Sequence, residues 1–173
     1  TVSHRHWSHL LSFYPLYLLN PDQKENLGLL NKSVDHWTKL LKGGDEGTGW
    51  DAGAASMYAA LGRSDDALEW MDRALSNFRL MPNTMYTENG DYNGKQAWND
   101  PALAFTQAVH DMLFSSWGGK IRLFPGTPTK WKDVIIHNVR TEGAFLVSAE
   151  RKNGVTQWVR IKSLAGEPCR INP

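Results

Sequence analysis

This sequence of 173 residues has little cysteine, no long apolar run and no excess of charge of one sign. Its single cysteine, Cys169, excludes an internal disulfide framework and leaves the cellular compartment open. The longest apolar run, residues 10–19, is about half of the roughly 20 residues that a membrane-spanning helix needs, and Pro15 interrupts it. Nineteen Lys and Arg balance eighteen Asp and Glu, which leaves no basic excess to bind a phosphate backbone. Neither a membrane nor a nucleic acid is therefore expected as the main partner.

Tryptophan, in contrast, is abundant, with eight residues in the chain. Large aromatic side chains most often fill a core. Flat indole rings also line sugar-binding clefts, because a pyranose ring stacks on an aromatic face. Composition alone favours the core and leaves the second interpretation open for individual residues.

Apolar periodicity predicts helices over the first two thirds of the chain. A short buried helix is expected at residues 7–14. The segment NPDQ at residues 20–23 has the cap, proline and glutamine of a helix start, and Gly43-Gly44 is typical of a helix end. Between them an apolar stripe at spacings of three and four is expected to be buried, and it consists of Leu27, Leu30, Val34, Trp37 and Leu41. Three more helices are expected at residues 50–61, where the side chains on one side are small, at residues 64–78 and at residues 100–117. The helix at residues 64–78 has one apolar face that should be buried, formed by Ala67, Trp70, Met71, Ala74, Leu75 and Phe78.

In the last third of the chain the apolar residues recur with a period of two residues, which is the period of a strand. Strands are expected at residues 121–124, 134–139, 144–150 and 155–161, with a hairpin turn at Lys152-Asn153-Gly154. Helices followed by a small antiparallel sheet make an α+β fold. The division is expected near Gly118, between residues 1–118 and residues 119–173. Residues 79–99 show no periodicity, and a loop of this length is typical of a functional or a disordered segment. Tyr86, Tyr92 and Trp98 lie in it and argue against simple disorder.

Three histidines lie close together in the segment HRHWSH at residues 4–9. Imidazoles at this spacing could bind a metal, but no nearby Asp, Glu or Cys completes a site. A structural role, in which the rings donate to backbone carbonyls, and a polar substrate pocket are the other two interpretations.

The segment GDEGTGWD at residues 44–51 is a glycine-rich turn. Its acidic residues would lie near the start of the following helix, where the helix dipole favours negative charge. The same segment could form a loop at the mouth of a cavity, with Trp50 beside it. No Gly-Lys-Ser or Gly-Lys-Thr follows, so it is not a phosphate loop.

Glu88, Asp91 and Asp100 are the carboxylates around the long loop. Glycoside hydrolysis commonly uses two carboxyl groups, one as general acid and the other as base or nucleophile. Asp100 precedes Pro101 at a helix start, which is also the pattern of an N-terminal cap. The two roles can coexist, because a helix N-terminus holds a carboxylate in place and keeps it ionised.

Four segments follow one another in an informative order. HRHWSHL at residues 4–10 leads to Tyr14-Pro15, and GDEGTGW follows at residues 44–50. ALGRSDDA comes at residues 60–67 and GKIRLFPGTP at residues 119–128. Together they resemble the corresponding segments of glycoside hydrolase family 95, which contains the 1,2-α-L-fucosidases and related α-L-galactosidases.

The resemblance implies an (α/α)6 barrel followed by a C-terminal β domain. This chain would supply the C-terminal part of the barrel in residues 1–118 and the β segment in residues 119–173. It implies a carbohydrate substrate, the remainder of the parent enzyme as a partner, and neither a cofactor nor a metal. The catalytic acid, a Glu, would lie upstream of Thr1, so the isolated chain is expected to be inactive.

The resemblance also implies an inverting mechanism, in which a carboxylate activates water and an acid about 6.5–9.5 Å away protonates the leaving oxygen. Asp100 aligns with the family's catalytic base, although Pro101-Ala102-Leu103-Ala104 replace the family's Gly-Asn-Phe-Gly after it. The other implied substrate contacts are His4, His6, Trp50, Trp98, Glu88 and Asp91. The alternative function is a non-catalytic helical module that binds carbohydrate or acts as a scaffold, in which Asp100 is only a cap.

Overall fold

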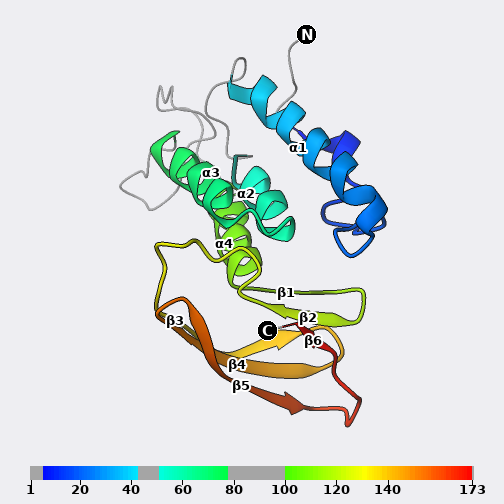
Figure 1. Cartoon of the computed structure of the whole chain (residues 1–173), viewed down its shortest axis with the longest axis vertical. Helices are drawn as coiled ribbons and strands as arrows, with labels where there is room; N and C mark the ends of the chain where they lie inside the picture. The colour runs from blue at the N-terminus through cyan, green and yellow to red at the C-terminus, as the bar shows by residue number, and fades with distance from the viewer. Residues whose placement is uncertain (1–5, 43–50, 78–99, 173) are drawn as a thin grey trace.

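The computed structural model describes residues 6–42, 51–77 and 100–172. In these ranges the helices form one layer and the strands form two small sheets beyond it (Figure 1). The helices are η1 (Ser8–Leu10), η2 (Lys24–Asn26), α1 (Leu27–Lys42), α2 (Asp51–Ala60), α3 (Ser64–Asn77) and α4 (Asp100–Leu113). The strands are β1 (Phe114–Trp117), β2 (Lys120–Leu123), β3 (Val134–Thr141), β4 (Phe145–Lys152), β5 (Val155–Ser163) and β6 (Ile171–Asn172). The arrangement is α+β, as expected, and the six-hairpin barrel stays a prediction.

Helix α2 is the centre of the helical layer and packs against both α3 and α4. Every residue from Asp51 to Ala59 is buried, so the helix has no solvent face. The predicted small-residue side is confirmed, because Ala52, Ala55 and Ala59 have no exposed surface. Small side chains allow the neighbouring helices to approach closely, and a helix that is apolar all round belongs in a core. No helix in the described ranges has the length and apolar character needed to cross a bilayer.

Helix α1 confirms the predicted apolar stripe except at Leu27, which is 38% exposed, and it begins later than its start signal. Leu30, Val34, Trp37 and Leu41 are buried along one face. The signal at residues 20–23 forms as expected, because the backbone N–H of Asn20 donates to Gln23 Oε1 at 3.0 Å. It opens a turn and the 3-10 helix η2, and the α-helix follows only at Leu27.

The helix expected at residues 7–14 is wrong. Only the 3-10 helix η1 forms there, and turns follow it. Burial was inferred correctly, since Leu10, Phe13 and Tyr14 are all in the core. The aromatic side chains are held by tertiary contacts, and these override the local preference for a regular helix.

Helix α3 places its apolar face in the core, with one exception. Trp70 is 2% exposed and Trp37, on α1, is 1% exposed, so the predicted burial of both is confirmed. Leu75, expected on the same face as Trp70, is instead 46% exposed. Phe78 lies outside the described residues.

The last helix ends four residues before the predicted end at residue 117. Residues Phe114–Trp117 form β1 and pair antiparallel with β2. Gly118 and Gly119 make the turn between these strands, with φ of 62° and 68°. Two consecutive positive φ values give a hairpin turn that matches the twist of the strands, and glycine adopts them without strain. The Gly-Gly pair therefore ends a strand rather than a helix.

The strands form two three-stranded sheets, in the orders β1-β2-β6 and β3-β4-β5. The predicted hairpin turn is confirmed, because Asn153 and Gly154 have φ of 52° and 77° between β4 and β5. The expectation of purely antiparallel pairing is wrong for β6, which pairs parallel with β2. A core between the sheets joins Ile121, Leu123 and Phe124 from one side to Ile136, Phe145, Val147 and Ala149 from the other.

The contrast between Trp70 and Leu75 on α3 gives a matched test of the helical core. We expect Trp70→Ala to lower the free energy of unfolding by about 3–5 kcal/mol, because it leaves a large cavity. Leu75→Ala should change it by less than about 1 kcal/mol, because that side chain is half exposed. Chemical denaturation monitored by circular dichroism measures both. Equal effects of the two substitutions would contradict the packing of α3.

Candidate functional site

A cleft of about 620 Å³ lies between the N-terminal segment, the end of α4 and the β1 hairpin. Its walls combine aromatic rings with polar groups, a composition suited to a polar ligand with flat apolar faces. The lining residues are Trp7, Tyr14, Pro15, Tyr17, Gln107, His110, Asp111, Phe114, Ser115, Ser116, Trp117 and Arg140.

One wall of the cleft is a stack of three planar groups. Tyr17 lies parallel to Trp117, with ring centroids 4.5 Å apart. The guanidinium of Arg122 covers the Trp117 ring at 3.2 Å from its centroid, a cation–π contact. Arg122 is in turn ion-paired with Asp22 at 2.6 Å. The stack joins the N-terminal segment to the β1 hairpin and fixes the orientation of this wall.

A buried polar cluster forms the floor of the cleft. The Tyr14 hydroxyl donates to Asp111 Oδ2 at 2.8 Å, and Gln107 Nε2 donates to Asp111 Oδ1 at 2.9 Å. Burial raises the pKa of Asp111, and hydrogen bonds from Ser56, Tyr14 and Gln107 act in the opposite direction without cancelling it. Burial and the neighbouring Asp111 charge raise the pKa of Tyr14 as well, so its hydroxyl keeps the proton that it donates.

The tryptophan of the histidine-rich segment packs directly on α2. A Cβ at Gly53 would overlap the Trp7 ring, so the glycine is required by space. The Trp7 ring also meets Trp37 edge-on, with centroids 5.8 Å apart. This contact attaches the segment that contains His6 to the first turn of α2.

Helices α2 and α4 run in the same direction (Figure 1). Their C-terminal ends meet at Gly126, which is in contact with both Ala59 and Met112. Met112 is twelve positions after the first residue of α4, and Ala59 is eight positions after the first residue of α2. At 1.5 Å per residue, α4 therefore begins about 6 Å further along the helix axis than α2. Asp100 and Asp51, the first residues of the two helices, lie at the same end of the helical layer.

The described ranges contain only two of the predicted site residues. His6 is half-buried, next to Trp7. Asp100 is the first residue of α4, and its side chain lies outside the description. Also outside it are His4, Trp50, Glu88, Asp91 and Trp98. Among the residues that are described, no group of three or more His, Cys, Asp or Glu could hold a metal ion.

Sequence reasoning missed the polar floor of the cleft. Its signal was available, because Asp111 interrupts the apolar stripe of α4 between Ala108 and Met112, both fully buried. An acid on the buried face of a helix requires hydrogen-bond partners, and here they come from Tyr14 and Gln107.

The raised pKa of Asp111 predicts a specific pH dependence of stability. The unfolded carboxyl loses its proton above about pH 4, whereas the folded one holds it to a higher pH. The folded state therefore loses stability relative to the unfolded state as pH rises between these two pKa values. Asp111→Asn removes this loss, so its free energy of unfolding should gain on that of the wild type as pH increases from 4 to 7. Denaturant unfolding at a series of pH values measures the difference, and parallel curves for the two proteins would refute the assignment.

Gly53 provides a test of the contact with Trp7. We expect Gly53→Ala to destabilise the protein by about 1–2 kcal/mol, since the overlap with Trp7 outweighs the better helix propensity of alanine. Gly28→Ala, in the first turn of α1, is the matched control. A Cβ there has no neighbour within 4 Å, so it should be neutral or stabilising. If Gly53→Ala behaves like Gly28→Ala in urea unfolding, Trp7 does not pack as described.

Comparison with known families relates the helical part of this chain to one family. A search of curated proteins gives no match. The model of the glycosyl hydrolase family 95 catalytic domain matches residues 1–113, which run from the histidine-rich segment to the last residue of α4. Because this match covers nearly two thirds of the 173 residues, the chain belongs to glycosyl hydrolase family 95.

Proposed function

We propose that this chain forms the C-terminal part of the catalytic domain of an inverting glycoside hydrolase. The substrate would be an oligo- or polysaccharide that carries α-L-fucosyl or α-L-galactosyl groups. The observation that carries the proposal is the family match over residues 1–113, which includes both the histidine-rich segment and the start of α4.

The proposed site lies at the N-terminal end of α2 and α4, whereas the cleft described above lies at the C-terminal end of α4, and Trp7 contacts both regions. Trp7 packs on the first turn of α2, and α4 begins about 6 Å beyond that turn. The remaining candidate groups precede these helices in the sequence, Trp50 directly before α2 and Glu88, Asp91 and Trp98 before α4. In this arrangement His4 and His6 donate hydrogen bonds to sugar hydroxyls, and Trp50 and Trp98 offer flat faces to the ring.

Asp100 is the proposed general base. A carboxylate at a helix N-terminus is stabilised in its ionised form by the helix dipole. Ionised Asp100 would remove a proton from a water molecule as the water oxygen bonds to the anomeric carbon. The glycosidic bond breaks on the opposite face, where a protonated carboxylic acid supplied by the rest of the parent enzyme gives its proton to the leaving oxygen. The product sugar therefore has inverted configuration.

A non-catalytic role remains the second candidate, and one observation favours it. Pro101-Ala102-Leu103-Ala104 replace the family's Gly-Asn-Phe-Gly directly after Asp100. In a module that only binds carbohydrate, Asp100 would cap α4 and accept hydrogen bonds from its first backbone amides.

The substitution Asp100→Asn in the intact parent enzyme separates the two candidates. Asparagine caps a helix about as well as aspartate, so the fold and sugar binding are retained. The amide cannot accept the proton of water, so kcat should fall by about 10²–10⁴-fold while KM changes little. Initial rates on a nitrophenyl α-L-fucoside and on an oligosaccharide measure the effect.

A matched control is Asp65→Asn at the start of α3. Asp65 also lies in the first turn of a helix, but α3 runs antiparallel to α2 and so begins at the opposite end of the layer (Figure 1). There its carboxylate accepts hydrogen bonds from Thr129. The control should retain kcat within about twofold, as expected for a surface change. If Asp100→Asn retains more than about a tenth of the parent kcat, Asp100 is a cap and not the base.

A further inference from the structure

The two parts of this chain carry opposite charge. Residues 1–113 contain nine Lys and Arg against fourteen Asp and Glu, a net charge of −5. Residues 114–173 contain ten against four, a net charge of +6. The near-neutral total of +1 hides this division. The family match covers only the acidic part, so the basic β part has no assigned role.

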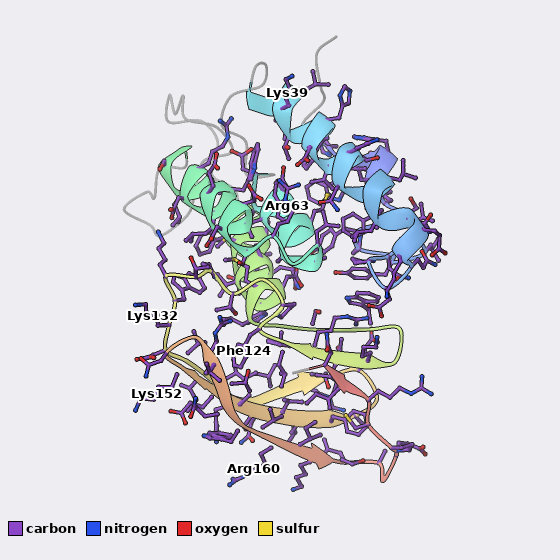
Figure 2. All side chains as sticks on the ribbon, in the orientation of Figure 1. Lys39, Arg63, Phe124, Lys132, Lys152 and Arg160 are labelled. Carbon is purple, nitrogen blue, oxygen red and sulfur yellow. The ribbon has the colours of Figure 1, made fainter. Side chains whose placement is uncertain are left out.

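The β3-β4-β5 sheet has one face in the core and one face in solvent. Side chains alternate between the faces along each strand, and directly paired residues share a face. We call the solvent side the outer face. Its cross-strand rows are Ile135–Glu150–Trp158, Ser148–Arg160 and Leu146–Lys162. Ser148 is buried, and its hydroxyl accepts a hydrogen bond from the backbone N–H of Asn138, so the exposed part of the middle row is Arg160. Figure 2 shows Arg160 projecting from β5 away from the helical layer.

An aromatic side chain is fixed in position on the outer face. Trp158 is 39% exposed, and its Nε1 donates to Glu150 Oε2 at 2.6 Å, directly across the strand pair. This charge-assisted hydrogen bond holds the polar edge of the indole and limits its rotation. A side chain that is ordered before binding loses less conformational entropy when a ligand stacks on it.

Two cations follow Trp158 along β5. Arg160 and Lys162 are both exposed and lie on the same face at steps of about 7 Å and 13 Å from Trp158. Ion pairs in the described part of the chain engage Arg63, Arg73, Lys120, Arg122 and Lys130. None there involves Arg160 or Lys162, so their charges are available to an anionic partner.

We propose that the outer face binds an anionic polysaccharide. A sugar ring stacks on Trp158, and sulfate or carboxylate groups along the same chain pair with Arg160 and Lys162. The surface is separate from the proposed site of hydrolysis, which lies at the far end of the helical layer, so the inference extends beyond the proposed function. Stacking distinguishes this partner from duplex nucleic acid, whose bases offer no free ring face outside the double helix.

The test measures binding of the full chain to dextran sulfate, with uncharged dextran and duplex DNA as comparison ligands. Wild-type protein should bind dextran sulfate in a salt-dependent manner and more tightly than DNA or dextran. The double variant Arg160→Glu/Lys162→Glu should weaken binding to dextran sulfate by about tenfold or more. Trp158→Ala should weaken it several-fold and leave DNA binding unchanged, whereas Trp158→Phe should retain most of it because a ring remains.

The matched control is Lys32→Glu/Lys39→Glu, which makes the same charge change on exposed positions of α1, far from β5 (Figure 2). It should stay within about twofold of the wild type, because distant exposed charges are screened. Circular dichroism and Tm establish that each variant is folded. Equal losses in the two double variants would overturn the proposal, since net charge alone would then explain binding. DNA binding as tight as that of dextran sulfate, together with no effect of Trp158→Ala, would overturn it as well.

Discussion

The buried hydrogen bond between Tyr14 and Asp111 joins the first and the last segments of the helical part of the chain. These residues are 97 positions apart in the sequence, and their side chains meet at 2.8 Å. The N-terminal segment is mostly turns, so it has little backbone structure of its own to hold it against α4. Its position therefore depends on side-chain contacts, and these are the hydrogen bond of Tyr14, the packing of Trp7 on α2, the Tyr17–Trp117 stack and the burial of Leu10 and Phe13.

The helices illustrate what sequence periodicity can predict. The stripes of α1 and α3 place Trp37 and Trp70 in the core, because a 3.6-residue period directly reports one buried face. The segment around Tyr14 was misassigned, because its aromatic residues are buried by tertiary contacts rather than along a periodic face. The sequence predicts the end of a helix where strand β1 forms, since four residues are too few to show a helical or a strand period.

The candidate site was only partly accessible to sequence reasoning. The sequence indicates the family through the motifs at residues 4–10 and 44–50. Together with Asp100, these motifs place the predicted site residues near the starts of the predicted helices. The polar floor around Asp111 does not follow from the sequence, because a single acid in an apolar stripe does not indicate which residues bind it. The structure is needed to identify Tyr14 and Gln107 as its hydrogen-bond partners. The outer face of the β sheet was missed for another reason. Composition averages charge over the chain, and the acidic helices cancel the basic strands.

That cancellation makes the molecule an electric dipole whose axis runs along its length. The acidic helices occupy one end and the basic sheets the other (Figure 1). In the electric field of a negatively charged polymer, such a molecule is oriented before contact, with its strands toward the polymer and its helices away from it. Once it has docked, the N-terminal ends of α2 and α4 point away from the chain that holds it. If the proposed docking and the proposed hydrolysis act together, the site at the helix N-termini would face a neighbouring chain or a side branch of the polymer and not the segment bound to the sheet.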